Sequence, residues 1–95
     1  RNLDDNKIEG GFYLPGTVTK ITMPNNRLSL GGLKTILSNS KRVNFLNIIG
    51  NPIGPILTAD TFAGLEMMRV LYISNCNLKY IQSGTFRAMK NLTML

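Results

Sequence analysis

One short pattern of apolar residues recurs along this chain at a nearly fixed interval. In its clearest copy, Leu71 and Ile73 are followed by Cys76, and then by Leu78 and Ile81. The corresponding residues 25 positions earlier (71 − 46) are Leu46, Ile48, Asn51, Ile53 and Ile56, and 25 positions before those (46 − 21) they are Ile21, Met23, Asn26 and Leu28. Because these offsets recur together in three copies, each copy is expected to fold in the same way and to pack against the next.

The repeated unit reads L-x-L-x-x-(N/C)-x-L. A period of roughly 20–29 residues with this pattern is the signature of a leucine-rich repeat. Each repeat of such an array buries its apolar edge against its neighbours, so 95 residues can form a continuous core. The expected fold class is an α/β solenoid: a leucine-rich-repeat horseshoe segment with short parallel strands on its concave face and short helices, turns and extended loops on its convex face.

The pattern divides residues 1–95 into a single leucine-rich-repeat segment. The expected repeats are residues 1–17, which are partial, then 18–42, 43–67 and 68–91, with 92–95 beginning a fifth. Leu95 is expected to match Leu71 at 24 positions (95 − 71), with one residue lost on the convex side. Arrays of this kind require polar terminal caps. Since the pattern is already under way at Leu3, we expect a piece of a longer array with its caps absent.

The spacing of apolar residues also predicts the local elements. Alternation with period two predicts a short strand in each repeat, and wider spacing predicts a helix. Residues 30–37 carry leucine and isoleucine at helical spacing, so a helix of one or two turns is expected there. Asp60 precedes Phe62, and we expect its side chain to cap a short helical turn.

The residue that follows each strand is expected to satisfy backbone groups inside a buried bend. Asparagine suits this place because its side chain has two N–H donors and one carbonyl acceptor. Cys76 takes the same place in its repeat, where a buried thiol donates weakly to a carbonyl; the alternative is a reactive thiol or one half of a disulfide. We call these residues the ladder, and its members are Asn6, Asn26, Asn51 and Cys76.

Composition and charge argue against several classes of function. The 11 basic and 5 acidic residues give a net charge of +6, but the basic residues are scattered among few aromatics, so no nucleic-acid partner is expected. No apolar run approaches the roughly 20 residues that cross a bilayer, so we expect no direct membrane insertion by this segment. With no histidine and one cysteine, the sequence offers no catalytic, metal or cofactor site, and we expect a protein that is not an enzyme.

The outward positions of the strands are expected to line up in rows on the concave side, a surface that we call the sheet face. Phe45, Ile49, Val70 and Tyr72 would gather there as an apolar and aromatic patch, with Met94 extending the row of Val70. Patches of this kind mark interfaces, although scattered surface hydrophobes without a ligand are the alternative. The expected ligand-binding residues are Lys20, Thr22, Phe45, Asn47, Ile49, Val70, Tyr72 and Ser74.

Two segments carry a family resemblance. The run I-x-x-G-T-F-R-A-M-K-N-L-T-M-L, from Ile81 to Leu95, resembles animal extracellular leucine-rich-repeat proteins of the Toll-receptor and cell-adhesion type. The run I-L-T-A-D-T-F-A-G-L, which ends at Leu65, resembles them too, and that family commonly carries phenylalanine at the places of Phe62 and Phe86. The resemblance implies a receptor or adhesion ectodomain that binds a protein ligand in innate immunity or cell–cell recognition. The resemblance is also compatible with dimerisation of such a receptor.

Asn91-Leu92-Thr93 is the one N-x-S/T sequon in the sequence. Such a site is used only on a surface in the secretory pathway, so we expect glycosylation at Asn91 and an extracellular or cell-surface location. The alternative is an intracellular leucine-rich-repeat scaffold or regulatory domain, and a structural spacer without a ligand is a third interpretation. A glycan at Asn91 would separate the first two.

Overall fold

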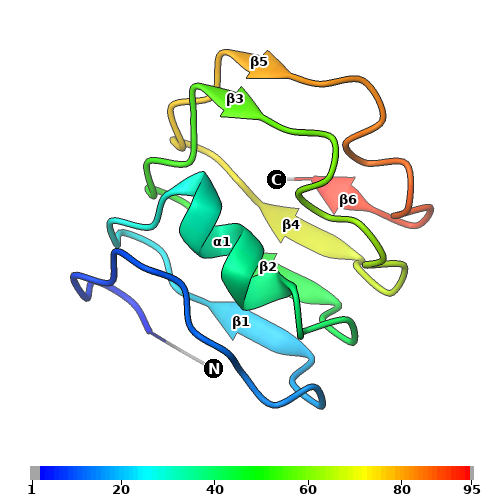
Figure 1. Cartoon of the computed structure of the whole chain (residues 1–95), viewed down its shortest axis with the longest axis horizontal. Coiled ribbons are helices and arrows are strands. Elements are labelled where there is room, and N and C mark those ends of the chain that lie inside the picture. The colour runs from blue at the N-terminus through cyan, green and yellow to red at the C-terminus, as the bar shows by residue number, and fades with distance from the viewer. Residues whose placement is uncertain (1–2, 95) are drawn as a thin grey trace.

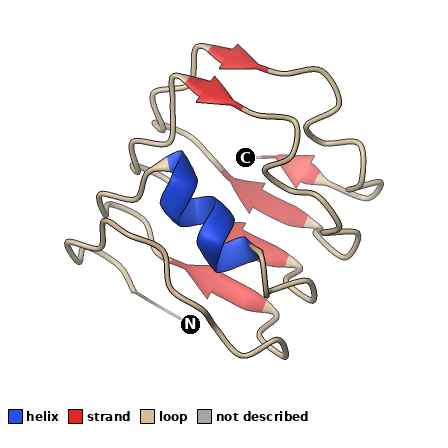
Figure 2. Cartoon of the chain, in the orientation of Figure 1, coloured by secondary structure: helices blue, strands red, loops and turns tan. Residues whose placement is uncertain are grey.

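The structure is a computed structural model that describes residues 3–94. It has two layers (Figure 1): a row of strands on one side, and a helix with two further strands on the other. Loops connect these short elements throughout (Figure 2). The elements are β1 (Lys20–Thr22), α1 (Leu30–Leu37), β2 (Phe45–Asn47), β3 (Ile56–Leu57), β4 (Val70–Tyr72), β5 (Tyr80–Ile81) and β6 (Thr93–Met94).

The strand pairs within residues 3–94 are parallel. The four-stranded sheet has the order β1-β2-β4-β6, and a two-stranded sheet pairs β3 with β5. Lys20 pairs with Phe45 and Phe45 with Val70, so partners lie 25 positions apart (45 − 20, 70 − 45). Parallel neighbours need a long crossover connection. Here each crossover passes through the opposite layer before the next strand begins (Figure 1).

Each three-residue strand points its central side chain into the core. Ile21, Leu46 and Leu71 are fully buried, whereas the residues on either side of them are exposed or half-buried. Successive side chains of a strand point to opposite faces. The alternation in the sequence therefore divides the four-stranded sheet into an inward and an outward face.

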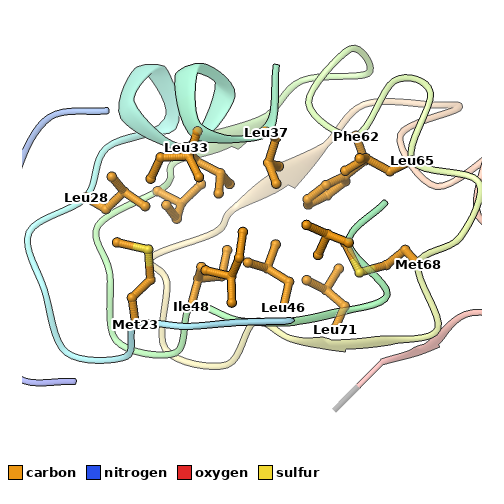
Figure 3. Packing of buried hydrophobic residues seen from close by; sticks show 14 of the residues in the cluster. Met23, Leu28, Leu33, Leu37, Leu46, Ile48, Phe62, Leu65, Met68 and Leu71 are labelled. Atoms are coloured by element: carbon orange, nitrogen blue, oxygen red, sulfur yellow. The ribbon is translucent and has the colours of Figure 1, made fainter. Parts of the chain in front are cut away.

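The core lies between the two layers. Leu46 and Leu71 approach from the sheet, and Leu33, Leu37 and Phe62 reach toward them from the opposite side (Figure 3). Helix α1 contributes because Leu33, Ile36 and Leu37 are buried along one side of it. Its N-terminus is capped by Ser29, whose Oγ accepts a hydrogen bond from the Gly32 N–H at 3.3 Å.

No second helix follows Asp60 within the residues that the structure describes. The chain there forms hydrogen-bonded turns, and the Asp60 backbone carbonyl accepts from the Ala63 N–H. The Asp60 carboxylate accepts instead from Thr58 Oγ1 at 2.6 Å and pairs with Lys34 Nζ at 2.9 Å. The hydrogen bond from Thr58, with the ammonium of Lys34, lowers the pKa of this carboxyl group. The prediction of a helical turn capped by Asp60 is therefore wrong.

The residue immediately before each ladder position is in the left-handed conformation. The φ angle is 54° at Asp5, 56° at Asn25, 77° at Gly50 and 57° at Asn75, and each of these residues immediately precedes a ladder residue. Asparagine, aspartate and glycine tolerate this conformation best. At Gly50 a Cβ atom would also meet Oδ1 of Asn25, so a larger residue there would require the Asn25 side chain to move.

The register between β3 and β5 differs from the one that the sequence offsets predict. Leu57 pairs with Ile81 at 24 positions (81 − 57), whereas the repeat offset of 25 matched Ile56 to Ile81. Leu57 is buried, while Ile56 and Ile81 are 43% and 51% exposed. A residue is lost near Gly54, where a Cβ atom would collide with the backbone oxygen of Asn77. The offset between the two repeats therefore falls from 25 in the four-stranded sheet to 24 at β3 and β5, and the two loops approach closely between these elements.

The register of β6 also differs. Thr93 pairs with Val70 and Met94 with Leu71, so the prediction that Met94 extends the row of Val70 is wrong by one residue. The Thr93 N–H donates to the Arg69 carbonyl at 2.7 Å, which is the same kind of bond that the Val70 N–H makes one strand earlier. The connection from β4 to β6 is shorter than the one from β2 to β4, and this bond fixes the register of β6 against β4. The predicted match of Leu95 to Leu71 lies outside the described residues.

Two alanine substitutions test the inward and outward positions. Leu71→Ala removes a fully buried side chain from β4 and is expected to lower the free energy of unfolding by about 2–5 kcal/mol. Thr19→Ala, at an exposed position just before β1, is the control and is expected to change it by less than about 0.5 kcal/mol. Urea denaturation measures both values, and equal losses would contradict the observed alternation.

Candidate functional site

The ladder residue Asn51 joins two successive turns of the chain. Its side-chain N–H groups donate to the Ile48 carbonyl in its own bend at 2.9 Å and to the Met23 carbonyl in the preceding bend at 3.0 Å. Its Oδ1 accepts from the Leu28 N–H at 3.1 Å. Because Asn51 is only 1% exposed, these bonds satisfy backbone groups that water does not reach.

Asn26 repeats this arrangement one turn earlier, and Asn6 does not. The Asn26 amide donates to the carbonyls of Met23 and Leu3, and its Oδ1 accepts from the Ile8 N–H. Asn6 is exposed and donates to the Asp4 carbonyl. Asn6 therefore matches the ladder pattern in sequence but does not bridge two bends within the described residues.

Cys76 lies in the ladder with a thiol in place of the amide. Its Sγ donates to the Ile48 carbonyl at 3.2 Å, 28 positions back, as Asn51 does to Met23. Sulfur is a weak acceptor, and the Ile53 N–H donates instead to the Asn51 backbone carbonyl at 2.8 Å. Burial raises the pKa of the Cys76 thiol above its ordinary value of 9.0. The thiol is therefore buried and neutral, the opposite of a reactive nucleophile.

The sheet face is formed by the outward side chains of the four-stranded sheet. Lys20, Phe45 and Val70 are paired across β1, β2 and β4, and the next row consists of Thr22, Asn47 and Tyr72. Lys20 is exposed, and the other five are half-buried. Neighbouring outward side chains thus shield one another without entering the core.

An aromatic pair occupies the middle of the sheet face. The rings of Phe45 and Tyr72 lie 5.5 Å apart between centroids, at an interplanar angle of 51°. The Lys20 ammonium lies 4.6 Å from the centroid of the Phe45 ring, within the range of a cation–π contact. The structure therefore brings a cation and two aromatic rings from three different strands into one cluster.

The remaining predicted residues of the sheet face lie past the ends of the strands. The half-buried Ile49 donates its N–H to Oδ1 of Asn47 at 3.2 Å, and its carbonyl accepts from the Asn25 N–H. The exposed Ser74 accepts with its backbone carbonyl from the Gly50 N–H. The backbone groups of Ile49 and Ser74 thus join successive bends. The cluster of the cation and the two rings is formed by residues of the strands themselves.

The structure also gathers residues that the repeat pattern did not single out. A hollow of about 470 Å³ lies at the turns leading into the strands and is lined by Asn44, Glu66, Met67, Arg69 and Asn91. Met67 is 53% exposed although it is a large apolar side chain. A methionine at a turn position outside the L-x-L pattern was the one available signal for this surface.

A second apolar surface lies in the opposite layer. Ile56, Tyr80 and Ile81 are exposed on the two-stranded sheet, with Tyr80 at 69%. A hollow of about 410 Å³ adjoins it, with Pro55 and Ile56 in its wall. The shift of register between β3 and β5, which sequence offsets did not reveal, is what turns Ile56 outward.

The described residues offer little chemistry beyond hydrogen bonding and packing. Between residues 3 and 94 there is no group of three histidine, cysteine or acidic side chains that would hold a metal ion. Within the same range, no helix is long and apolar enough to cross a membrane.

No family model matches this chain, and no solved structure matches it. The family resemblance of the Phe62 and Phe86 segments therefore stays a prediction.

Substitutions at Cys76 test its place in the ladder. Cys76→Asn should preserve stability, because the amide can donate to the same Ile48 carbonyl. Cys76→Leu should lower the free energy of unfolding by about 1–3 kcal/mol, because that buried carbonyl loses its donor. Both values are measured by denaturant unfolding, and equal stability of the two variants would contradict the assignment.

The burial of Cys76, which raises the pKa of its thiol, can also be tested on the unsubstituted protein. A thiol reagent should label native protein much more slowly than unfolded protein. Because the thiol ionises at lower pH when unfolded, its contribution to stability is present below pH 9.0 and is lost as pH rises through the higher folded value. Rapid labelling of the native state would show that Cys76 is accessible.

Proposed function

We propose that this chain is a segment of a leucine-rich-repeat solenoid that acts as a non-catalytic protein-recognition module, in a receptor or adhesion ectodomain. The proposal of a solenoid is supported by parallel strands whose partners lie 25 positions apart and by side chains that bridge successive bends. The extracellular assignment draws on the sequon at Asn91 and on the resemblance of the Phe62 and Phe86 segments.

The observation that carries the binding role is the cluster of Lys20, Phe45 and Tyr72. A sheet that is buried on one face needs no large apolar side chains on the other, where polar residues are the rule. Phe45 and Tyr72 are half-buried there, with their rings in contact and a cation beside them. Aromatic and basic anchors of this kind supply much of the binding energy at protein interfaces.

Size limits how much of a partner this segment binds. Four strands at a spacing of about 4.8 Å span roughly 14 Å. A standard interface covers about 800 Å² on each partner. The segment therefore contributes a central contact, and surfaces beside the sheet complete the footprint.

A paired substitution tests the sheet face. The unaltered chain is screened against arrayed ectodomains of secreted and cell-surface proteins, and each binder is then measured with the double variant Phe45→Ala, Tyr72→Ala. Loss of both aromatic anchors is expected to weaken binding by about 2 kcal/mol or more, which corresponds to roughly 30-fold. Surface plasmon resonance gives the affinities.

Lys79→Ala is the matched control, because Lys79 is an exposed residue at the start of the opposite layer. This variant should bind like the unaltered chain. A binder that is insensitive to the double variant, with the fold retained, would place the binding site elsewhere. The absence of any binder across the array would contradict the recognition role and favour a structural spacer.

A further inference from the structure

The turn before β6 presents the sequon Asn91-Leu92-Thr93 in an accessible form. Asn91 lies in the turn and is exposed, and the side chain of Thr93 is exposed at the first position of β6. Leu92 packs partly against the core, which holds the turn in place. The acceptor amide and the hydroxyl that define the sequon are thus both on the surface.

Exposure at this position does not depend on β6 being the last strand of the sheet. Met67 occupies the equivalent turn one strand earlier, 24 positions back (91 − 67), and is 53% exposed although β6 is paired beside its own strand. Arg42, 25 positions before Met67 (67 − 42), is exposed as well. The row of turns remains open to solvent even where a further strand is added.

The surroundings of Asn91 suit a sugar. Asn91 lines the hollow of about 470 Å³, together with Asn44, Glu66, Met67 and Arg69. Pockets of roughly 300–1,000 Å³ accommodate small ligands. Arg69 and Asn44 can hydrogen-bond sugar hydroxyls, and the methionine side chain offers apolar contact to the C–H face of a pyranose ring.

We propose that Asn91 carries an N-linked glycan whose first sugar lies over the hollow lined by Asn44, Met67 and Arg69. In the transfer, Nδ2 of Asn91 attacks C1 of a lipid-pyrophosphate-linked oligosaccharide. The bond from C1 to the pyrophosphate oxygen breaks, the lipid pyrophosphate leaves, and the amide loses one proton. The glycan shields this flank of the sheet and leaves the sheet face itself open.

The modification is tested by secreting the chain from eukaryotic cells behind a cleavable signal. The unaltered chain should gain the mass of one oligosaccharide, which a peptide N-glycosidase removes. Asn91→Gln and Thr93→Ala should abolish the gain, and Thr93→Ser, which keeps the sequon, should retain it. Asn44→Gln is the control for an amide in the same hollow outside the sequon. A secreted unaltered chain without added mass would overturn the proposal.

Methionine oxidation tests where the sugar lies. Met67 and Met94 are 53% and 48% exposed, so hydrogen peroxide should oxidise both in the unglycosylated Asn91→Gln variant. In the glycosylated chain, Met67 should oxidise several-fold more slowly while Met94 keeps its rate. Equal rates at Met67 in the two proteins, or protection of Met94 alone, would overturn the placement. None of these outcomes depends on the sheet face binding a partner, so the two proposals fail separately.

Discussion

The structure depends on one recurring interaction: a buried side chain that satisfies the carbonyls of two successive bends at once. Asn51 binds the carbonyls of Ile48 and Met23 and accepts from Leu28, all without access to water. A buried backbone group without a partner costs about 1–3 kcal/mol. The chain can therefore stack its tight bends only where such a residue is present, and within residues 3–94 no buried side-chain nitrogen or oxygen lacks a partner.

The rest of the architecture follows from these bends. Once successive bends are joined, the strands before them lie side by side in parallel, with Leu46 beside Leu71. Alternation then sends Leu46 and Leu71 inward and turns Phe45 and Tyr72 to the same outward surface. The aromatic cluster of the sheet face is thus a consequence of register, and the register is set by hydrogen bonds at the strand ends.

The sequence predicted the features that depend on local spacing. The alternation around Leu46 and Leu71, the helix over residues 30–37 and the shared position of Asn51 and Cys76 all follow from apolar periodicity and side-chain chemistry. The features it missed depend on contacts between turns. The loops approach closely at Gly54 and Asn77, and the register that follows leaves Ile56 exposed. The Thr93 N–H donates to the Arg69 carbonyl, and Thr93 pairs with Val70 in place of Met94. Asn6 matches the pattern yet is exposed and donates to the Asp4 carbonyl in its own bend.

The most direct test of this account is the stability of Asn51→Leu. Leucine keeps a similar volume but removes both donors and the acceptor, which leaves the carbonyls of Met23 and Ile48 and the N–H of Leu28 without their partner. Denaturant unfolding should then show a loss of more than about 3 kcal/mol in the free energy of unfolding. A variant within about 0.5 kcal/mol of the unaltered chain, the range of ordinary surface changes, would contradict the claim that the bridging side chains hold the stack together.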